Sequence, residues 1–192
     1  MSQQEPRLKS ARHIAAEVFA QTVREGDRVV DATLGTGQDC LLLCQLVGEG
    51  GKVYGFDVQQ DALRRTQERL KKQGIAHRAT LHLVGHERMA EFVQQGVRLA
   101  AFNLGWLPGS DKSVTTQAQT TLQALDAALG LLAPLGMLVV CIYPGHAEGA
   151  REQDAILDWC SQLSPKRYTA LWHRFINGGL GAPSCLVVEK IK

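Results

Sequence analysis

One short segment near the start of the chain constrains its fold more than any other. Asp27–Asp39 runs from an apolar stretch into an acidic residue, then into a glycine loop and the start of a helical pattern. A second apolar stretch, 52–57, ends in the carboxylate Asp57, at about the 20-residue separation of a nucleoside-binding βαβ unit. The glycines let the backbone approach a ligand, and the carboxylate accepts hydrogen bonds from ribose hydroxyls. This order of residues predicts an α/β protein that binds an adenosine-containing cofactor.

The details of the glycine loop bear on which cofactor is bound. A dinucleotide site requires G-x-G-x-x-G; Gly35 and Gly37 match the first two glycines, but Cys40 occupies the third position. The pattern also begins earlier, at Asp31, and D-x-x-x-G-x-G resembles the first motif of Rossmann-like methyltransferases that use S-adenosylmethionine. That cofactor has no pyrophosphate, so the third glycine is not needed. We therefore expect S-adenosylmethionine, with a nucleotide cofactor or a purely structural glycine turn as alternatives.

Apolar periodicity and breaker residues predict alternating helices and strands along the whole chain. Strands are expected at 28–31, 52–57, 79–84, 97–104, 137–143, 168–176 and 184–190. Helices are expected at 8–24, 38–47, 61–72, 117–132 and 148–162, with a short one after His86. The last two strands are joined by the short glycine-rich loop 177–181, so they must be antiparallel, because a parallel crossover needs a dozen or more residues. We expect a mostly parallel, Rossmann-like seven-stranded sheet with an antiparallel last strand and helices on both faces.

Length and composition bound the class of protein. We expect one domain over residues 1–192, with residues 1–26 as an N-terminal helical segment packed on the core. The net charge is only +2, so an RNA site would have to be a local patch. The five cysteines form no C-x-x-C pair, and there is no apolar signal or membrane-length run. These features predict a cytoplasmic protein with reduced thiols, no membrane association and no metal site.

Ligands of open α/β sheets bind at the carboxyl ends of the strands, so the residues that follow each strand are the candidate site. Asp57 is the strongest candidate, although it could serve only as a helix N-cap. Val58 could pack on the adenine, and His86 and Glu87 lie where adenine is usually bordered, although Glu87 could simply favour a helix N-terminus. The expected cofactor-binding residues are Asp31, Thr33, Gly35, Gly37, Gln38, Asp39, Asp57, Val58, His86, Glu87 and Asn103.

The stretch that begins at Asn103 resembles the Asn/Asp-Pro-Pro-Tyr motif of amino-directed methyltransferases. Asn103 and Trp106 keep the residue types and spacing, while Leu-Gly replaces Pro-Pro. By this resemblance Asn103 and the Leu104 carbonyl orient a target amine, and Trp106 stacks on the base unless it is a core aromatic. Asp111 and His146 are weaker candidates for receiving a proton, and a lone loop histidine is often uninvolved. The expected catalytic residues are therefore Asn103, Leu104, Trp106, Asp111 and His146.

Several motifs together resemble a small bacterial family formerly labelled rRNA methylases. They are Ala11-Arg-His, Val30-Asp-Ala-Thr-Leu-Gly-Thr-Gly-Gln-Asp, Gly85-His-Glu, Phe102-Asn-Leu-Gly-Trp-Leu-Pro-Gly-Ser-Asp-Lys and Tyr143-Pro-Gly-His-Ala-Glu-Gly. Members of this family are associated with methylating 5-aminomethyl-(2-thio)uridine at the tRNA wobble position. The resemblance implies methyl transfer from S-adenosylmethionine to the aminomethyl nitrogen of uridine 34. It also implies the tRNA anticodon loop as partner and makes a homodimer plausible.

An RNA substrate would need cationic side chains that reach its phosphates. The expected RNA-binding residues are Arg7, Lys9, Arg12, Lys112 and Arg174. Three other functions stay open at this point. They are methylation of another substrate such as rRNA or a small amine, a nucleotide-dependent oxidoreductase, and a non-catalytic RNA-binding module. The intact set of Gly35, Gly37 and Asp57 disfavours the last of these.

Overall fold

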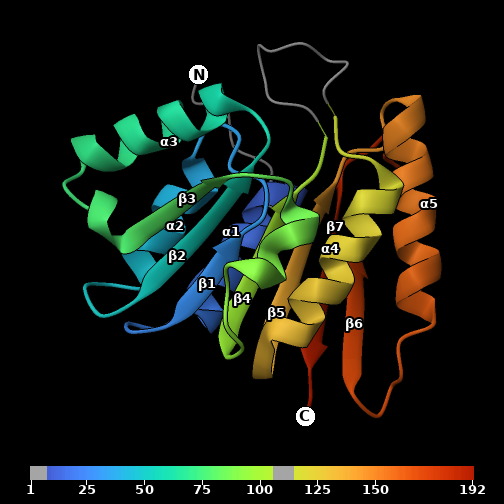
Figure 1. Ribbon diagram of the computed structural model, residues 1–192. Helices are drawn as coiled ribbons and strands as arrows, with labels where there is room; N and C mark the ends of the chain where they lie inside the picture. Colours follow the sequence, from blue (N-terminus) through green and yellow to red (C-terminus); the bar gives the residue numbers. More distant parts are fainter. Residues whose placement is uncertain (1–7, 106–114) are drawn as a thin grey trace, which may run out of the picture.

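The computed structural model describes residues 8–105 and 115–192, so the predictions for Arg7, Trp106, Asp111 and Lys112 lie outside the described residues. Figure 1 shows one sheet with helices packed against it. The strands are β1 (Arg28–Asp31), β2 (Lys52–Asp57), β3 (Ala79–Leu83), β4 (Val97–Asn103), β5 (Leu132–Ile142), β6 (Tyr168–His173) and β7 (Ser184–Lys190). The helices are α1 (Ala11–Thr22), α2 (Gln38–Leu46), α3 (Gln60–Lys72), α4 (Ala118–Leu131) and α5 (Ala147–Ser161), with short 3-10 turns η1 (Ala76–Arg78) and η2 (His86–Glu91).

The sheet has seven strands in the order β3-β2-β1-β4-β5-β7-β6. The β1–β2, β1–β4, β2–β3 and β4–β5 pairs are parallel, whereas β7 runs antiparallel to both β5 and β6. The predicted parallel sheet with an antiparallel end is therefore confirmed. The order reverses direction beside β1 and β4, and this switch point is where an open α/β sheet leaves a crevice at the carboxyl ends of its strands.

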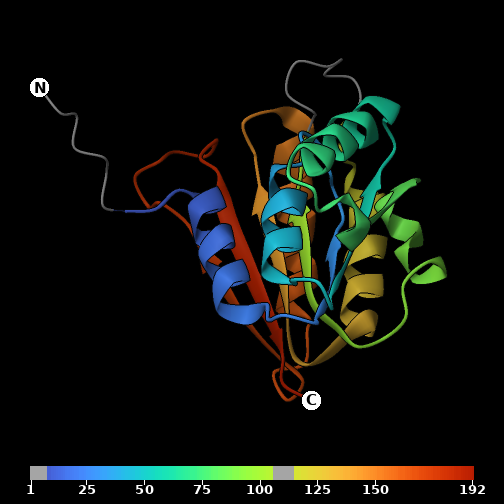
Figure 2. The same ribbon diagram turned by 90° about the vertical axis from the view of Figure 1, so that its left-hand side faces the viewer.

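Helices cover both faces of the sheet, as expected from the alternation of side chains along each strand (Figure 2). Val29 joins one buried cluster, which takes in α1, α2 and α3, and the adjacent Val30 joins the other, which takes in η2, α4 and α5. The N-terminal helix α1 belongs to the first cluster because its buried residues, Ala11, Ala15 and Phe19, face the sheet. This packing holds the first turn of α1 beside the strand ends.

Two strand boundaries were predicted wrongly. The strand expected to begin at residue 137 begins instead at Leu132, directly after α4, and its pairing with β4 shifts register within β5. An added Cβ on Gly136 would lie 2.8 Å from the Ala133 carbonyl oxygen, so only glycine fits where the pairing register shifts. Strand β6, the first strand of the final hairpin, ends at His173 and not at residue 176. The first error arises because pairing with β4 extends the strand past Pro134 and Gly136, and the second because β6 pairs with β7 only as far as His173.

Among the described residues, no helix is long and apolar enough to cross a membrane. Over the same residues no group of three or more histidine, cysteine or acidic side chains is placed to hold a metal ion. The five cysteines are free thiols, four of them buried.

Candidate active site

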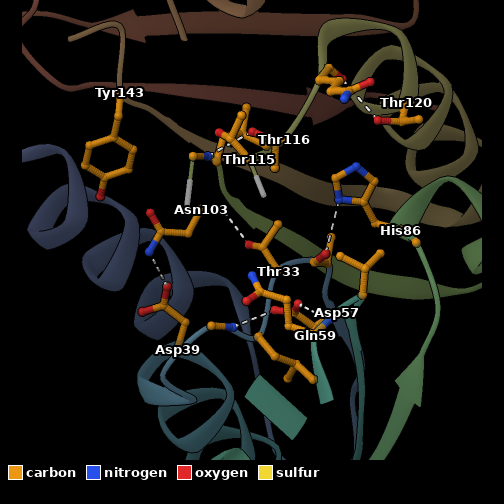
Figure 3. A pocket seen from close by; sticks show the side chains of 18 of the residues that line it. Thr33, Asp39, Asp57, Gln59, His86, Asn103, Thr115, Thr116, Thr120 and Tyr143 are labelled. Atoms are coloured by element: carbon orange, nitrogen blue, oxygen red, sulfur yellow. Dashed lines mark hydrogen bonds between the residues drawn. The ribbon is translucent and has the colours of Figure 1, made fainter. Parts of the chain in front are cut away.

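A cavity of about 560 Å³ opens at the carboxyl ends of β1, β2, β4 and β5. Figure 3 shows side chains from these strand ends and from the start of α2 converging on it. Of the sequence-predicted residues, it brings together Thr33, Gly35, Gln38, Asp39, Asp57, Val58, His86, Glu87, Asn103, Leu104 and His146. Arg12, predicted as an RNA contact, also lines it, whereas Asp31 and Gly37 are not among its lining residues.

The glycine loop between β1 and α2 is shaped by two residues in the left-handed region, Gly35 at φ 50° and Gly37 at φ 74°. A side chain at Gly37 would place its Cβ 2.8 Å from the Thr66 Cα, so this glycine serves the close packing of the loop on α3. The Gly35 amide instead donates a 3.0 Å hydrogen bond to Asp57 Oδ2. The two glycines therefore have different tasks, and only Gly35 lies on the cavity wall.

Asp57 is oriented by two backbone donors, and the N-cap of α3 is Gln59 and not Asp57. Its Oδ1 accepts a 2.9 Å hydrogen bond from the Gln59 amide, which orders the turn into α3, and its Oδ2 accepts from Gly35. Each carboxylate oxygen can accept more than one hydrogen bond, so the group still has capacity for ligand hydroxyls at the cavity surface. The two backbone donors hold the carboxylate in one orientation before any ligand arrives.

Asp31 is the most perturbed acid of the site. It is 1% exposed; its Oδ1 accepts a 3.2 Å hydrogen bond from the Thr33 amide, and its Oδ2 has no partner among the described residues. Burial, followed by the negative charge of Asp39, raises the pKa of Asp31 from 3.8 to about 8. A buried carboxyl with an unsatisfied oxygen beneath a ligand cavity is a group that a bound cation would complement.

Two residues that line the cavity, His86 and Val58, differ strongly in solvent exposure. His86 is 8% exposed, and its Nδ1 lies 3.3 Å from the Ala32 carbonyl oxygen, which assigns the Nδ1 proton as the donor. Burial lowers the pKa of His86, so the ring is neutral and forms an apolar wall against Phe102. Val58 is 61% exposed at the mouth of the cavity. A flat neutral ring and an exposed aliphatic side chain suit a purine.

Asn103 at the end of β4 is held by two hydrogen bonds. Its backbone amide donates a 2.7 Å hydrogen bond to Thr33 Oγ1, and its side-chain Nδ2 donates a 3.2 Å hydrogen bond to Asp39 Oδ2. Arg12 of α1 reaches the same place and contacts Asp39 Oδ1 at 3.3 Å and Gln38 Oε1 at 2.9 Å. The first helix, the glycine loop and the end of β4 are thereby joined at one wall of the cavity.

Gly105 and Thr116, which lie on either side of the undescribed segment 106–114, are hydrogen-bonded to each other. The Gly105 amide donates to Thr116 Oγ1, and the Thr116 amide donates back to the Gly105 carbonyl. The Thr116 and Thr121 hydroxyls both donate to the buried carboxylate of Glu152, at 2.8 and 2.6 Å. Burial raises the pKa of Glu152. Glu152 on α5 therefore fixes Thr116, and through it Gly105, in position.

His146 is positioned as the N-cap of α5, where its Nδ1 accepts a 3.2 Å hydrogen bond from the Gly149 amide. A neutral imidazole that accepts at Nδ1 carries its proton on Nε2 and therefore presents a donor. The role of His146 as a proton acceptor stays a prediction, and its Nδ1 is already engaged in the helix cap.

Some residues of the cavity were not predicted from the sequence. Tyr143, Thr115, Thr116 and Thr120 line it. Tyr143 follows β5 directly and belongs to the motif Tyr143-Pro-Gly-His-Ala-Glu-Gly, but the sequence gave its side chain no role. Burial raises the pKa of Tyr143, so it remains a neutral phenol. The threonines gave no signal in the sequence, because Thr115 and Thr116 precede α4, Thr120 lies in its first turn, and only the fold brings this segment to the cavity.

Two of the predicted RNA contacts, Lys9 and Arg174, line a second groove, of about 360 Å³, between the start of α1 and the end of β6. Lys9 pairs with Glu17 at 2.9 Å, and the Arg174 guanidinium lies 5.2 Å from the centre of the Trp172 ring. Phe175 and Pro183 add apolar surface to the groove. Cationic and aromatic groups thus occur together outside the main cavity.

The charge of the main cavity separates the cofactor alternatives. Asp39, Asp57 and Glu87 line it, and Arg12 is the one lysine or arginine among the described lining residues. A pyrophosphate would meet excess negative charge there, whereas a sulfonium and an ammonium would meet complementary charge. The residues present fit S-adenosylmethionine and not a dinucleotide. The fold and the cavity together define the class as the class I S-adenosylmethionine-dependent methyltransferases.

Comparison with known proteins gives the family within this class. The family described as "Putative rRNA methylase" matches residues 53–189, and the chain belongs to it. The crystal structure of the putative rRNA methylase from Clostridium thermocellum superimposes with a TM-score of 0.95 at 36% identity, covering 97% of this chain and 100% of that one. A putative methyltransferase from Streptococcus mutans, solved in complex with SAH, has a TM-score of 0.87 at 32% identity, covering 95% and 99%.

A curated relative is also similar in sequence. The chloroplastic tRNA (mnm(5)s(2)U34)-methyltransferase of Arabidopsis thaliana is 39% identical over 158 residues, which is 77% of this chain. The chain spans 58% of the length of that relative.

Proposed function

We propose that this protein binds S-adenosylmethionine in the main cavity and methylates the aminomethyl nitrogen of 5-aminomethyl-(2-thio)uridine at the wobble position of tRNA. The observation that carries the proposal is the placement of Asn103 on the wall of a cavity suited to this cofactor, with its side chain held by Asp39. The plant relative named for this reaction supports the choice of substrate. The bacterial relative solved with SAH supports the choice of cofactor.

The cofactor half of the cavity is assigned as follows. Asp57 accepts the ribose hydroxyls, because its carboxylate is oriented by Gly35 and Gln59 at the cavity wall. His86 and Val58 border the adenine. The buried carboxyl of Asp31, whose Oδ2 has no partner among the described residues, would be stabilised in its ionised form by a nearby positive charge.

When bound, S-adenosylmethionine supplies the methyl group: the amine nitrogen forms the new N–C bond, the C–S bond breaks with its electron pair passing to sulfur, and S-adenosylhomocysteine and a proton are released. Only the neutral amine has a lone pair for this attack, and an alkyl ammonium has a pKa near that of lysine, about 10. The chain must therefore favour the neutral amine and hold it in line. Asn103 and the Leu104 carbonyl accept the amine N–H groups and orient the lone pair, a form of positioning that can lower a barrier by several kcal/mol.

The RNA side of the proposal rests on the groove between α1 and the end of β6. Lys9 and Arg174 approach phosphates, and Phe175 offers a surface on which an unpaired base can stack. Gly145, in the loop after β5, lies against Gly181 of the β6–β7 loop. The loop after β5 also carries Tyr143 and His146, which line the main cavity, so the groove and the cavity are neighbours. A strand that lies in the groove can thus place a neighbouring nucleotide at Asn103.

The test is a nucleoside mass analysis after incubation of the protein and S-adenosylmethionine with tRNA that carries 5-aminomethyluridine at the wobble position. The expected result is that this nucleoside alone gains the mass of one methyl group in place of a hydrogen. Ribosomal RNA from the same source is assayed in parallel, because the family description names rRNA. Methylation of rRNA with none of tRNA would refute the proposed substrate and retain the methyltransferase activity.

A further inference from the structure

Three side chains from distant parts of the chain form one hydrogen-bonded series at the cavity wall. Asn103 Nδ2 donates to Asp39 Oδ2 at 3.2 Å, and Arg12 donates to Asp39 Oδ1 at 3.3 Å. The same Arg12 nitrogen also donates to Gln38 Oε1 at 2.9 Å, which fixes the guanidinium on the first turn of α2. Figure 3 shows the Asp39–Asn103 contact on the same wall as Tyr143.

The carboxylate determines which end of the Asn103 amide faces the cavity. An ionised carboxylate only accepts hydrogen bonds, whereas a side-chain amide has a donor end and an acceptor end. The donor end must therefore face Asp39, and the acceptor oxygen of Asn103 points away from it, toward the side of the cavity where Tyr143 lies (Figure 3). The backbone amide of the same residue is bonded to Thr33 Oγ1 at 2.7 Å, so the residue cannot turn as a whole.

The guanidinium of Arg12 partly neutralises the negative charge of Asp39. A carboxylate with no counter-charge, one residue removed from a bound amine, would stabilise the ammonium form and so reduce the fraction of the nucleophilic neutral form. The guanidinium offsets that charge while Asp39 keeps both of its hydrogen bonds. Asp39 thereby orients the amide without holding a proton on the substrate.

We propose that Asp39 and Arg12 are positioning residues that present the Asn103 oxygen to the substrate, so that the cavity selects a neutral amine that donates N–H. The proposal rests on the proposed function, because it assigns the substrate group that Asn103 meets. It also gives the N-terminal helix a task in the chemistry: α1 supplies the counter-charge for a residue on α2.

The kinetic test compares Asp39→Leu, Asp39→Asn and Arg12→Gln with Arg98→Gln. Arg98 belongs to an ion pair with Asp27, at the opposite end of β4 from Asn103, and is the matched control. Asp39→Leu is expected to lower kcat about tenfold or more, with KM for tRNA and Kd for S-adenosylhomocysteine changed less than about twofold. Asp39→Asn keeps an oxygen that can accept from Asn103 and is expected to restore most of the rate.

The pH profile separates the role of Arg12 from a merely structural one. Loss of the guanidinium leaves Asp39 uncompensated, which raises the apparent pKa of the bound amine. The acid limb of kcat in Arg12→Gln is therefore expected to move to higher pH, while that of Arg98→Gln stays at the wild-type position. A lower rate with an unshifted profile would overturn the role given to Arg12. Loss of S-adenosylhomocysteine binding in Asp39→Leu, in proportion to rate, would make Asp39 a cofactor ligand and overturn its role here.

A second measurement does not depend on any substrate. The side-chain amide signals of Asn103 in a ¹H–¹⁵N spectrum of the free protein are identified by their loss in Asn103→Ala. They are expected to shift in Asp39→Leu and to stay in place in Arg98→Gln. Signals that do not move in Asp39→Leu would refute the hydrogen bond on which the inference depends. If the wild-type protein fails to methylate tRNA, the proposed function fails, and this spectrum still decides whether Asp39 orients Asn103.

Discussion

The raised pKa of Asp31 leads to a prediction about stability. In the folded protein the group is 1% exposed with one unpartnered oxygen, and its pKa is about 8 instead of 3.8. At neutral pH the unfolded chain therefore ionises Asp31 while the folded chain keeps it protonated, and ionisation favours unfolding. The span from 3.8 to pH 7 is about three pKa units at about 1.4 kcal/mol each, which gives about 4 kcal/mol. Because the group is buried, this value needs no reduction for solvent screening.

The replacement Asp31→Asn removes the titration and keeps an oxygen that can accept the Thr33 amide. The free energy of unfolding is expected to rise by up to about 4 kcal/mol at pH 7, because the asparagine has no ionised form in the unfolded state. The difference from wild type should vanish below about pH 4 and reach its full size above about pH 8, since the wild-type contribution is lost as pH rises through the folded pKa.

Urea denaturation without cofactor, at several values between about pH 4 and pH 9, measures this difference directly. Every other titrating group is common to both proteins, so its contribution cancels in the comparison. Two results would refute the reasoning. One is a variant less stable than wild type at pH 8, and the other is a stability difference that does not change with pH.

Three further predictions concern the cavity and its supports. Asp57→Ala should weaken S-adenosylmethionine binding about tenfold or more by calorimetry, since a hydrogen bond to a charged group contributes about 1.5–3 kcal/mol; unchanged affinity would remove Asp57 from the site. Gly37→Ala should lower thermal stability more than Gly74→Ala, because both have positive φ but only Gly37 has α3 within 3 Å of the added Cβ; equal losses would mean that the contact is unimportant. Glu152→Ala should destabilise the fold by about 1–3 kcal/mol, since it leaves two buried hydroxyls without an acceptor, and Glu152→Gln should lose less; equal losses would contradict this.

Much of the fold followed from local pattern. The alternation of apolar stretches with helical periodicity predicted each strand of the sheet, and the short loop between β6 and β7 required the antiparallel end. The strand-end rule then gathered Asp57, His86 and Asn103 without any knowledge of distances. These inferences succeeded because the period of burial and the length of a connection are properties of the chain itself.

Other features depended on which elements the fold brings together. The role of Gly37 as a contact to α3, the clamp of Thr116 on Glu152 and the capping of α5 by His146 all join elements whose separation no local pattern encodes. The start of β5 was misplaced for the same reason, because pairing with β4 extends the strand past a proline and a glycine.

The sequence by itself determined the class of fold, the cofactor chemistry and the strand ends at which the site would form, because these depend on residue type, period and order along the chain. Only the tertiary structure decided that Arg12 belongs to the cavity wall and that burial raises the pKa of Asp31. The burial of Asp31 and the proximity of α1 to α2 arise from the packing of helices against the sheet. The direction of a hydrogen bond and the pKa of a buried group depend on that packing, which cannot be derived from the order of residues alone.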